Sequence, residues 1–117
     1  MLYKLSDGEN VKTELTNIAL LNLRSDQPEA YKNYYAAFKR MGDSEKMDAI
    51  FDPLTIIYTA YLCAESGERM SYEKFVERAP FDVEHNVTFC GELIAAKKGQ
   101  ASAKPLKGQR KSAGAQT

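Results

Sequence analysis

The segment from Leu54 to Ala64 is apolar on nearly every side when it is drawn as a helix. A helix without a polar face has to be enclosed by other elements or covered by a partner. Its β-branched residues also suit a buried strand, but the length of the run and the preceding Asp52-Pro53 favour a helix. Asp52 is expected to cap this helix, and Glu65-Ser66-Gly67 to end it. The sequence therefore predicts a domain arranged around one central helix, or a helix face that awaits a partner.

Two helices are predicted before the central one. Thr16 is a suitable N-cap for a short helix that carries four large aliphatic residues and ends near Ser25. Asp26 is predicted to cap the second helix, with Pro28 in its first turn and Gly42 after its last residue. The apolar face of the second helix is mainly aromatic, and it consists of Tyr31, Tyr34, Tyr35, Phe38 and Met41.

Two further helices are predicted after the central one. Ser71 can cap a short helix that Pro80 stops, and Asp82 can cap a last helix that reaches Ala96. Gly91 lies inside that last helix, where glycine costs roughly 1 kcal/mol relative to alanine. Its presence there indicates that another backbone packs closely against this position.

The first residues of the chain have the alternating pattern of a β-hairpin. Tyr3 and Leu5 alternate with polar residues before Asp7-Gly8, and apolar and polar residues alternate again over residues 11–15. Arms this short need a helix to pack against. The predicted fold is therefore mainly α, a compact bundle of about five short helices with a small N-terminal β-hairpin.

The end of the chain differs sharply in composition from the rest. Residues 97–117 contain no acidic residue and one large aliphatic residue, Leu106. Residues 1–96 hold 10 of the 16 basic residues and all 16 acidic ones, which gives them a net charge near −6. We therefore predict a helical domain over residues 1–96 and a disordered, basic, low-complexity tail over residues 97–117. The basic residues of this tail are Lys97, Lys98, Lys104, Lys107, Arg110 and Lys111.

Residue types that carry chemistry are sparse. His85 is the only histidine, and Cys63 and Cys90 both fall in apolar helical patterns, where buried free thiols are expected. The carboxylates fall on the solvated faces of the predicted helices, and the glycines do not form a phosphate-binding loop. The sequence thus predicts a protein that is not an enzyme, without catalytic residues, cofactor or metal. It also predicts neither a signal segment nor a membrane span, and hence a cytoplasmic protein.

Binding sites can be predicted only as alternatives. The aromatic residues of the second helix and of the central helix either pack in the core or form a protein-binding surface, where tyrosine is enriched. The basic tail is either a solubilising extension or an arm for nucleic acid or for an acidic protein. No aromatic residue lies between its basic residues, so contacts with nucleic acid would be to phosphates alone. The candidate partner-binding residues are Tyr31, Tyr34, Tyr35, Phe38, Tyr58 and Tyr61.

The order of the hydrophobic blocks over about residues 1–98 resembles that of a known family, the tail assembly chaperones of long-tailed bacteriophages of Gram-positive hosts. The resemblance implies a small protein of the infected cell's cytoplasm, without enzymatic activity and absent from the mature virion. Such proteins coat the long helical tape-measure protein, keep it soluble and help to recruit tail-tube subunits. The blocks that carry the resemblance are Tyr3–Leu5, Leu15–Ile18, Tyr31–Phe38, Phe51–Tyr61, Ser71–Phe75, Pro80–Asp82, Gly91–Ile94 and Lys97-Lys98.

The resemblance also implies particular partners and an unusual mode of translation. The expected partners are the tape-measure protein and the tail-tube protein, and coating of a filament is compatible with self-association. Members of the family often make a longer product by a programmed ribosomal slip, and Ala96-Lys97-Lys98 is compatible with the slippery codons GCA-AAA-AAG. An alternative reading is a small adaptor or regulatory module whose basic tail binds nucleic acid. A third is an enzyme subunit without an active site of its own.

Overall fold

The computed structural model describes residues 1–102, with side chains as far as Lys97. The described part is mainly helical, with five helices and one two-stranded antiparallel hairpin, as the sequence predicts. The strands are β1 (Leu2–Lys4) and β2 (Asn10–Lys12). The helices are α1 (Asn17–Asp26), α2 (Pro28–Met41), α3 (Phe51–Ala64), α4 (Tyr72–Arg78) and α5 (Val83–Ser102).

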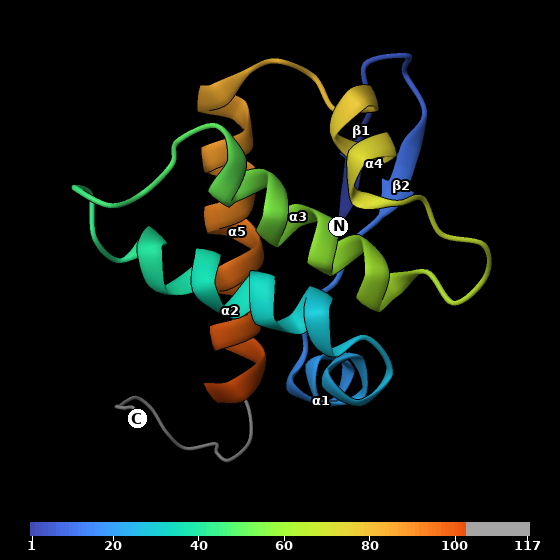
Figure 1. The fold of residues 1–117 in the computed structure, drawn as a ribbon, viewed down its shortest axis with the longest axis vertical. Helices are drawn as coiled ribbons and strands as arrows, with labels where there is room; N and C mark the ends of the chain where they lie inside the picture. The colour runs from blue at the N-terminus through green and yellow to red at the C-terminus, as the bar shows by residue number, and fades with distance from the viewer. Residues whose placement is uncertain (103–117) are drawn as a thin grey trace.

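Helix α3 lies at the centre of the fold. It contacts each of the four other helices as well as β2, and Figure 1 shows it crossing the middle of the molecule. The side chains of Ile56, Ile57 and Ala60 are completely enclosed, and Leu54 and Leu62 are buried beside them. The neighbouring elements of the same chain therefore cover this apolar helix. Of the two alternatives that the sequence leaves open, the enclosed central helix is confirmed.

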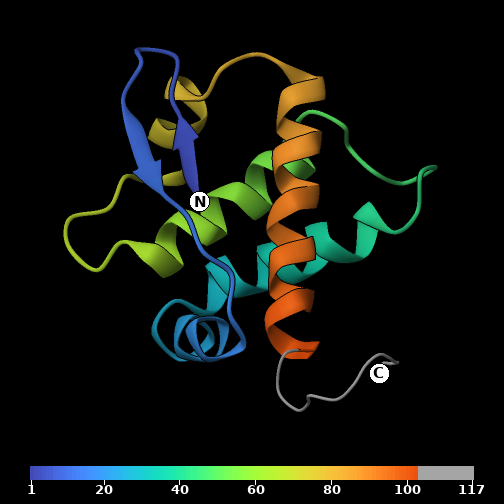
Figure 2. The same ribbon diagram turned by 180° about the vertical axis from the view of Figure 1, so that it is seen from behind.

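The hairpin is short and turns where the sequence predicts. Tyr3 pairs with Val11 in the antiparallel register, and Gly8 in the connecting loop has a φ of 93°, which favours glycine. The side chain of Tyr3 is fully buried and its ring packs against Phe75 of α4 and Phe89 of α5, with ring centroids 5.8 and 5.1 Å apart. Tyr3 thus joins the hairpin to α4 and α5, and Figure 2 shows the hairpin in front of α4 with α5 to one side.

Polar contacts fix the hairpin in this position. The Tyr3 hydroxyl donates a 2.6 Å hydrogen bond to Oδ1 of Asn86, a buried residue of α5, and Nδ2 of Asn86 donates to the carbonyl of Pro80. The N–H of Ser6 donates to the carbonyl of Arg78 at the end of α4. The Arg78 side chain also forms ion pairs with two carboxylates of the hairpin loop, those of Asp7 and Glu9. The first residues of the chain are therefore held by its second half.

Three of the predicted N-caps are confirmed. The Thr16 hydroxyl accepts from the N–H of Ala19 at 3.1 Å, and the Ser71 hydroxyl accepts from the N–H of Lys74 at 3.2 Å. The carboxylate of Asp82 accepts from the N–H of His85 at 3.0 Å. Each bond satisfies a donor that the first turn of a helix leaves without a partner. The stop signals at Gly42, at residues 65–67 and at Pro80 are confirmed as well.

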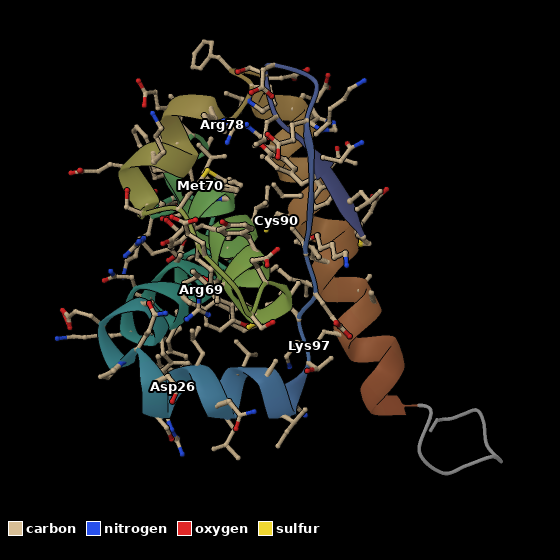
Figure 3. The ribbon with its side chains drawn as sticks, turned by 90° about the vertical axis from the view of Figure 1, so that its right-hand side faces the viewer. Asp26, Arg69, Met70, Arg78, Cys90 and Lys97 are labelled. Carbon is tan, nitrogen blue, oxygen red and sulfur yellow. The ribbon has the colours of Figure 1, made fainter. Side chains whose placement is uncertain are left out.

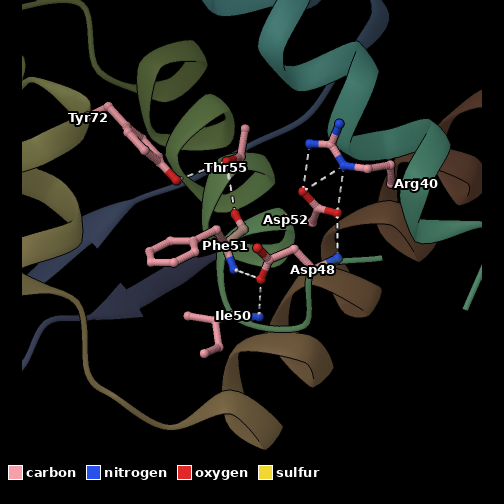
Figure 4. A network of polar contacts seen from close by, with 7 residues as sticks. All are labelled: Arg40, Asp48, Ile50, Phe51, Asp52, Thr55 and Tyr72. Atoms are coloured by element: carbon pink, nitrogen blue, oxygen red, sulfur yellow. Dashed lines mark hydrogen bonds and ion pairs between the residues drawn. The ribbon is translucent and has the colours of Figure 1, made fainter. Parts of the chain in front are cut away.

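The two other predicted caps are wrong. Asp26 is the last residue of α1, and the single residue Gln27 joins it to α2, so there is no separate turn for Asp26 to cap. Asp52 lies inside the first turn of α3, which begins at Phe51, and its carboxylate binds the Arg40 guanidinium (Figure 4). The N–H groups of Ile50 and Phe51 instead donate to Asp48, which takes over the capping role.

Helix α5 differs from the prediction in two respects. It continues six residues past Ala96, to Ser102, because the two lysines, the glutamine and the alanine among them are compatible with a helix even without an apolar stripe. A Cβ atom at Gly91 would meet nothing within 4 Å, so the predicted close packing at this glycine is wrong. The predicted disorder from residue 103 onward concerns residues outside the described part.

Candidate functional site

The aromatic face of α2 is divided between the core and the surface. Tyr34 is 5% exposed and belongs to the core, whereas Tyr35 is 50% and Phe38 37% exposed. Tyr31 is half-buried, and its ring stacks parallel to that of Tyr35 with centroids 6.4 Å apart. Tyr34 and Phe38 also stack, with ring centroids 6.0 Å apart and ring planes inclined by 28°. The four rings therefore form one continuous aromatic strip along α2.

Helix α1 contributes aliphatic side chains beside this strip. Leu20 and Leu23 are buried against the rest of the fold, but Ile18 and Leu21 are 63% and 47% exposed. The exposure follows from the spacing, because at 3.6 residues per turn Ile18 and Leu21 fall on the opposite side of the helix from Leu20 and Leu23. The exposed Leu21 of α1 thus lies next to exposed aromatic groups on α2.

A groove of about 300 Å³ lies between the two helices. It extends to the last turns of α5, from which Lys97 reaches its edge. We call it the α1–α2 groove; its lining residues are Asn17, Leu20, Leu21, Arg24, Tyr31, Tyr34, Tyr35, Phe38 and Lys97. All four aromatic residues that the sequence predicts on α2 are therefore brought together here.

The rim of the groove carries positive charge. The Arg24 guanidinium lies 6.0 Å from the centroid of the Tyr31 ring, and the Lys39 ammonium lies 4.9 Å from that of Tyr35. Both distances allow a cation–π attraction. Lys97 adds a third cation from α5; Figure 3 shows it near the start of α1, whereas Asp26 marks the other end of that helix. Among the side chains that the structure describes, no carboxylate lines the groove.

Tyr58 and Tyr61 do not belong to this groove. Both lie on α3 and bind the backbone of Met70, which precedes α4. The Tyr58 hydroxyl donates to the Met70 carbonyl at 2.8 Å, and the Tyr61 hydroxyl accepts from the Met70 N–H at 2.8 Å. Both tyrosines thus pack in or against the core, and their hydroxyl groups fix the loop between α3 and α4. Tyr58 also borders a second hollow, of about 410 Å³, between α2, α3 and α4.

Of the basic tail, Lys97 is the one residue whose side chain the structure describes. It lies within α5 and on the edge of the groove, so it belongs to the folded body. Lys98 continues the same helix. The remaining four candidate residues, Lys104, Lys107, Arg110 and Lys111, lie outside the described residues.

The residues with nucleophilic or metal-binding chemistry are dispersed. Cys90 is buried and Cys63 half-buried, and both are free thiols. Burial raises the pKa of Cys90 to about 12 and that of Cys63 to about 11, with smaller contributions from Asp52 and Glu14 respectively. His85 is exposed at the start of α5. In the part that the structure describes, no three histidine, cysteine or carboxylate side chains are grouped as a metal site would require.

The sequence alone did not indicate the residues of α1 and α5 that line the groove. It assigned the aromatic residues of α2 as candidates, but not Leu21 or Arg24 of α1, nor the inclusion of Lys97 in the folded body. The placement of aliphatic residues on both sides of α1 was a usable sign of a second apolar face. The position of α5 beside α1 depends on tertiary packing, and no local pattern reports it.

Comparison with known proteins finds no matching protein family, no matching curated protein and no matching solved structure. Within residues 1–102, no helix has an apolar stretch long enough to cross a membrane.

Proposed function

We propose that this protein is a tail assembly chaperone of a long-tailed bacteriophage. In this role it binds the tape-measure protein, keeps it soluble and helps to recruit tail-tube subunits. It acts in the cytoplasm of the infected host cell, without enzymatic activity, and leaves before the virion is finished. The resemblance of residues 1–98 to this family motivates the proposal, and one structural observation supports it: the exposed apolar strip along the α1–α2 groove.

The surface suits this role for a physical reason. A tape-measure protein is a long amphipathic chain, and its exposed apolar stripe promotes aggregation until another surface covers it. Leu21, Tyr35 and Phe38 form such a surface at the groove. Amphipathic helices bind in apolar grooves through side chains spaced at i, i+3, i+4 and i+7. Many copies bound along one filament give a strong total attachment even when each contact is weak.

Co-expression tests the proposal directly. The partner is the long helical protein whose gene lies just downstream in the same phage, and its distribution between pellet and supernatant is measured with and without this chain. We expect the partner to move to the soluble fraction and to co-purify with the chain. A partner that stays in the pellet beside soluble, folded chaperone contradicts the proposal.

The nucleic-acid alternative needs a deletion that respects the observed fold. Because α5 continues to Ser102, removal of residues 103–117 leaves the described helices intact, whereas removal from Lys97 would shorten α5. A salt-sensitive shift of DNA by the full chain that is lost on this deletion would favour an adaptor over a chaperone. We expect the deletion to leave solubilisation of the tape-measure protein unchanged.

The proposed ribosomal slip at Ala96-Lys97-Lys98 would fall inside α5, and not after it. The longer product would then share the helix up to this point and continue it with a different sequence. Reading the gene tests this: the run A-AAA-AAG and an overlapping downstream frame are expected, and their absence rules the slip out.

A further inference from the structure

The α1–α2 groove differs in charge from the body that carries it. Residues 1–96 have a net charge near −6, yet the charged residues that line the groove are Arg24 and Lys97, and Lys39 lies over the ring of Tyr35, which also lines it. None of the three takes part in an ion pair among the described side chains. Asp26 and Glu29 lie nearby at the junction of α1 and α2, but neither lines the groove. The apolar strip is therefore bordered by uncompensated positive charge.

We infer that the α1–α2 groove binds an amphipathic helix whose apolar face is flanked by glutamate or aspartate. Leu20 and Tyr34 form the buried floor, and Leu21, Tyr35 and Phe38 form exposed walls that receive apolar side chains. The cations at the rim then face the acidic flanks, which fixes the orientation of the helix and speeds its encounter with the groove. That this helix belongs to a tape-measure protein rests on the function proposed above.

The charge of the groove argues against two other occupants. A second copy that docked through the same face would bring Arg24, Lys39 and Lys97 against their own counterparts, and such like-charge contacts are unfavourable. The chain's own segment from residue 103 onward contains four basic residues and no acidic one, so the same repulsion opposes it. An acidic helix is the occupant for which both the apolar strip and its rim are complementary.

Two synthetic helical peptides test the inference without the tape-measure protein. Both have about 18 residues with leucines at i, i+3, i+4 and i+7, and one has glutamates on the flanks where the other has lysines. Fluorescence anisotropy of labelled peptide measures binding to the full chain at low and at high salt. We expect the glutamate peptide to bind about tenfold more tightly than the lysine peptide at low salt, and this ratio to shrink as salt screens the rim. Equal affinities, preference for the lysine peptide, or no binding of either would overturn the inference.

Charge reversal on the protein locates the site. The double variant Arg24→Glu/Lys97→Glu is expected to lose the preference for the glutamate peptide, whereas Lys46→Glu, in the loop between α2 and α3, is expected to keep it. For the apolar strip, Tyr35→Ser should weaken the binding of both peptides. Phe81→Ser should leave the binding unchanged, because Phe81 is 86% exposed and lies outside the groove. Circular dichroism confirms that each variant is folded. Unchanged binding by the groove variants would overturn the assignment of the site.

The two levels of the proposal can fail separately. A chain that solubilises the tape-measure protein but does not discriminate between the peptides retains the proposed function and loses this inference. A chain that binds the glutamate peptide through the groove but leaves the tape-measure protein insoluble retains the groove assignment and loses the proposed function.

Discussion

The guanidinium of Arg40, at the end of α2, holds the carboxylate of Asp52 in the first turn of α3, with Nη2–Oδ1 and Nε–Oδ2 distances of 2.8 and 3.0 Å. The N–H of Asp48 donates to the same carboxylate at 2.9 Å. Burial alone would raise the pKa of Asp52, but the hydrogen bonds from Arg40 and Asp48 outweigh it and lower the pKa below its ordinary value. One carboxylate therefore fixes the loop between α2 and α3 at both of its ends.

Removal of this carboxylate should destabilise the fold. We expect Asp52→Ala to lower the free energy of unfolding by about 2 kcal/mol, because it leaves the Asp48 N–H and the Arg40 guanidinium without their shared acceptor. Urea denaturation at pH 7 measures the change. The matched control is Glu77→Ala, which removes a carboxylate from the exposed ion pair with Lys74 and should change stability little. Similar losses in both variants would contradict a special role for Asp52.

The same carboxylate should make stability sensitive to acid. Because its pKa is lower in the folded than in the unfolded chain, the folded chain binds fewer protons, and its stabilisation is complete above the ordinary pKa of 3.8. It is lost as the pH falls below that value towards the folded pKa. The difference in unfolding free energy between the natural protein and Asp52→Asn is therefore expected to be constant from about pH 7 to 5 and to shrink below about pH 4. A difference that does not vary with pH would contradict this.

The contact between the hairpin and α5 should depend on one hydroxyl group. Tyr3→Phe keeps the packing against Phe75 and Phe89 but leaves the buried Oδ1 of Asn86 without its donor. We expect a loss of about 1–2 kcal/mol in the free energy of unfolding, measured by urea denaturation with an unchanged m-value. Tyr35→Phe removes a hydroxyl from a half-exposed ring and serves as the control, with an expected change below about 0.5 kcal/mol. An unchanged free energy of unfolding in Tyr3→Phe would show that this hydrogen bond does not stabilise the fold.

The two thiols should be inert in the folded protein. Burial raises the pKa of Cys90 to about 12 and that of Cys63 to about 11, so both are protonated at pH 8 and neither is a good nucleophile. We expect a thiol reagent such as dithionitrobenzoate to react slowly with the folded chain and quickly with both cysteines in urea. Fast reaction of one thiol in the folded protein at pH 8 would contradict the burial described for it.

Local patterns predicted the elements of this fold well. The central position of α3 follows from its lack of a polar face, and the hairpin follows from alternation around a glycine. Thr16, Ser71 and Asp82 cap the helices that follow them because a short polar side chain next to free N–H groups needs no distant partner.

The wrong predictions concern residues whose role depends on a partner far away in the sequence. Asp52 looks like a cap in sequence, but Arg40, twelve residues earlier, binds it instead. The division of the aromatic face of α2 is a similar case, because Tyr34 is buried and Tyr35 exposed only once the other helices have packed against α2. The cationic rim of the groove combines residues from α1, α2 and α5, and no spacing within one segment reveals it.

The bond between Tyr3 and Asn86 joins residues 83 positions apart, so it can form only after the start of α5 has been synthesised. The hairpin is synthesised before the helix that receives Tyr3. A lone two-stranded hairpin is marginal in water, and pairing of distant positions slows folding. Tyr3 therefore lacks this partner until the segments between the hairpin and α5 have been translated. The side chain of Tyr3 can thus be buried only when α5 is present, and a chain that stops before α5 cannot complete its fold.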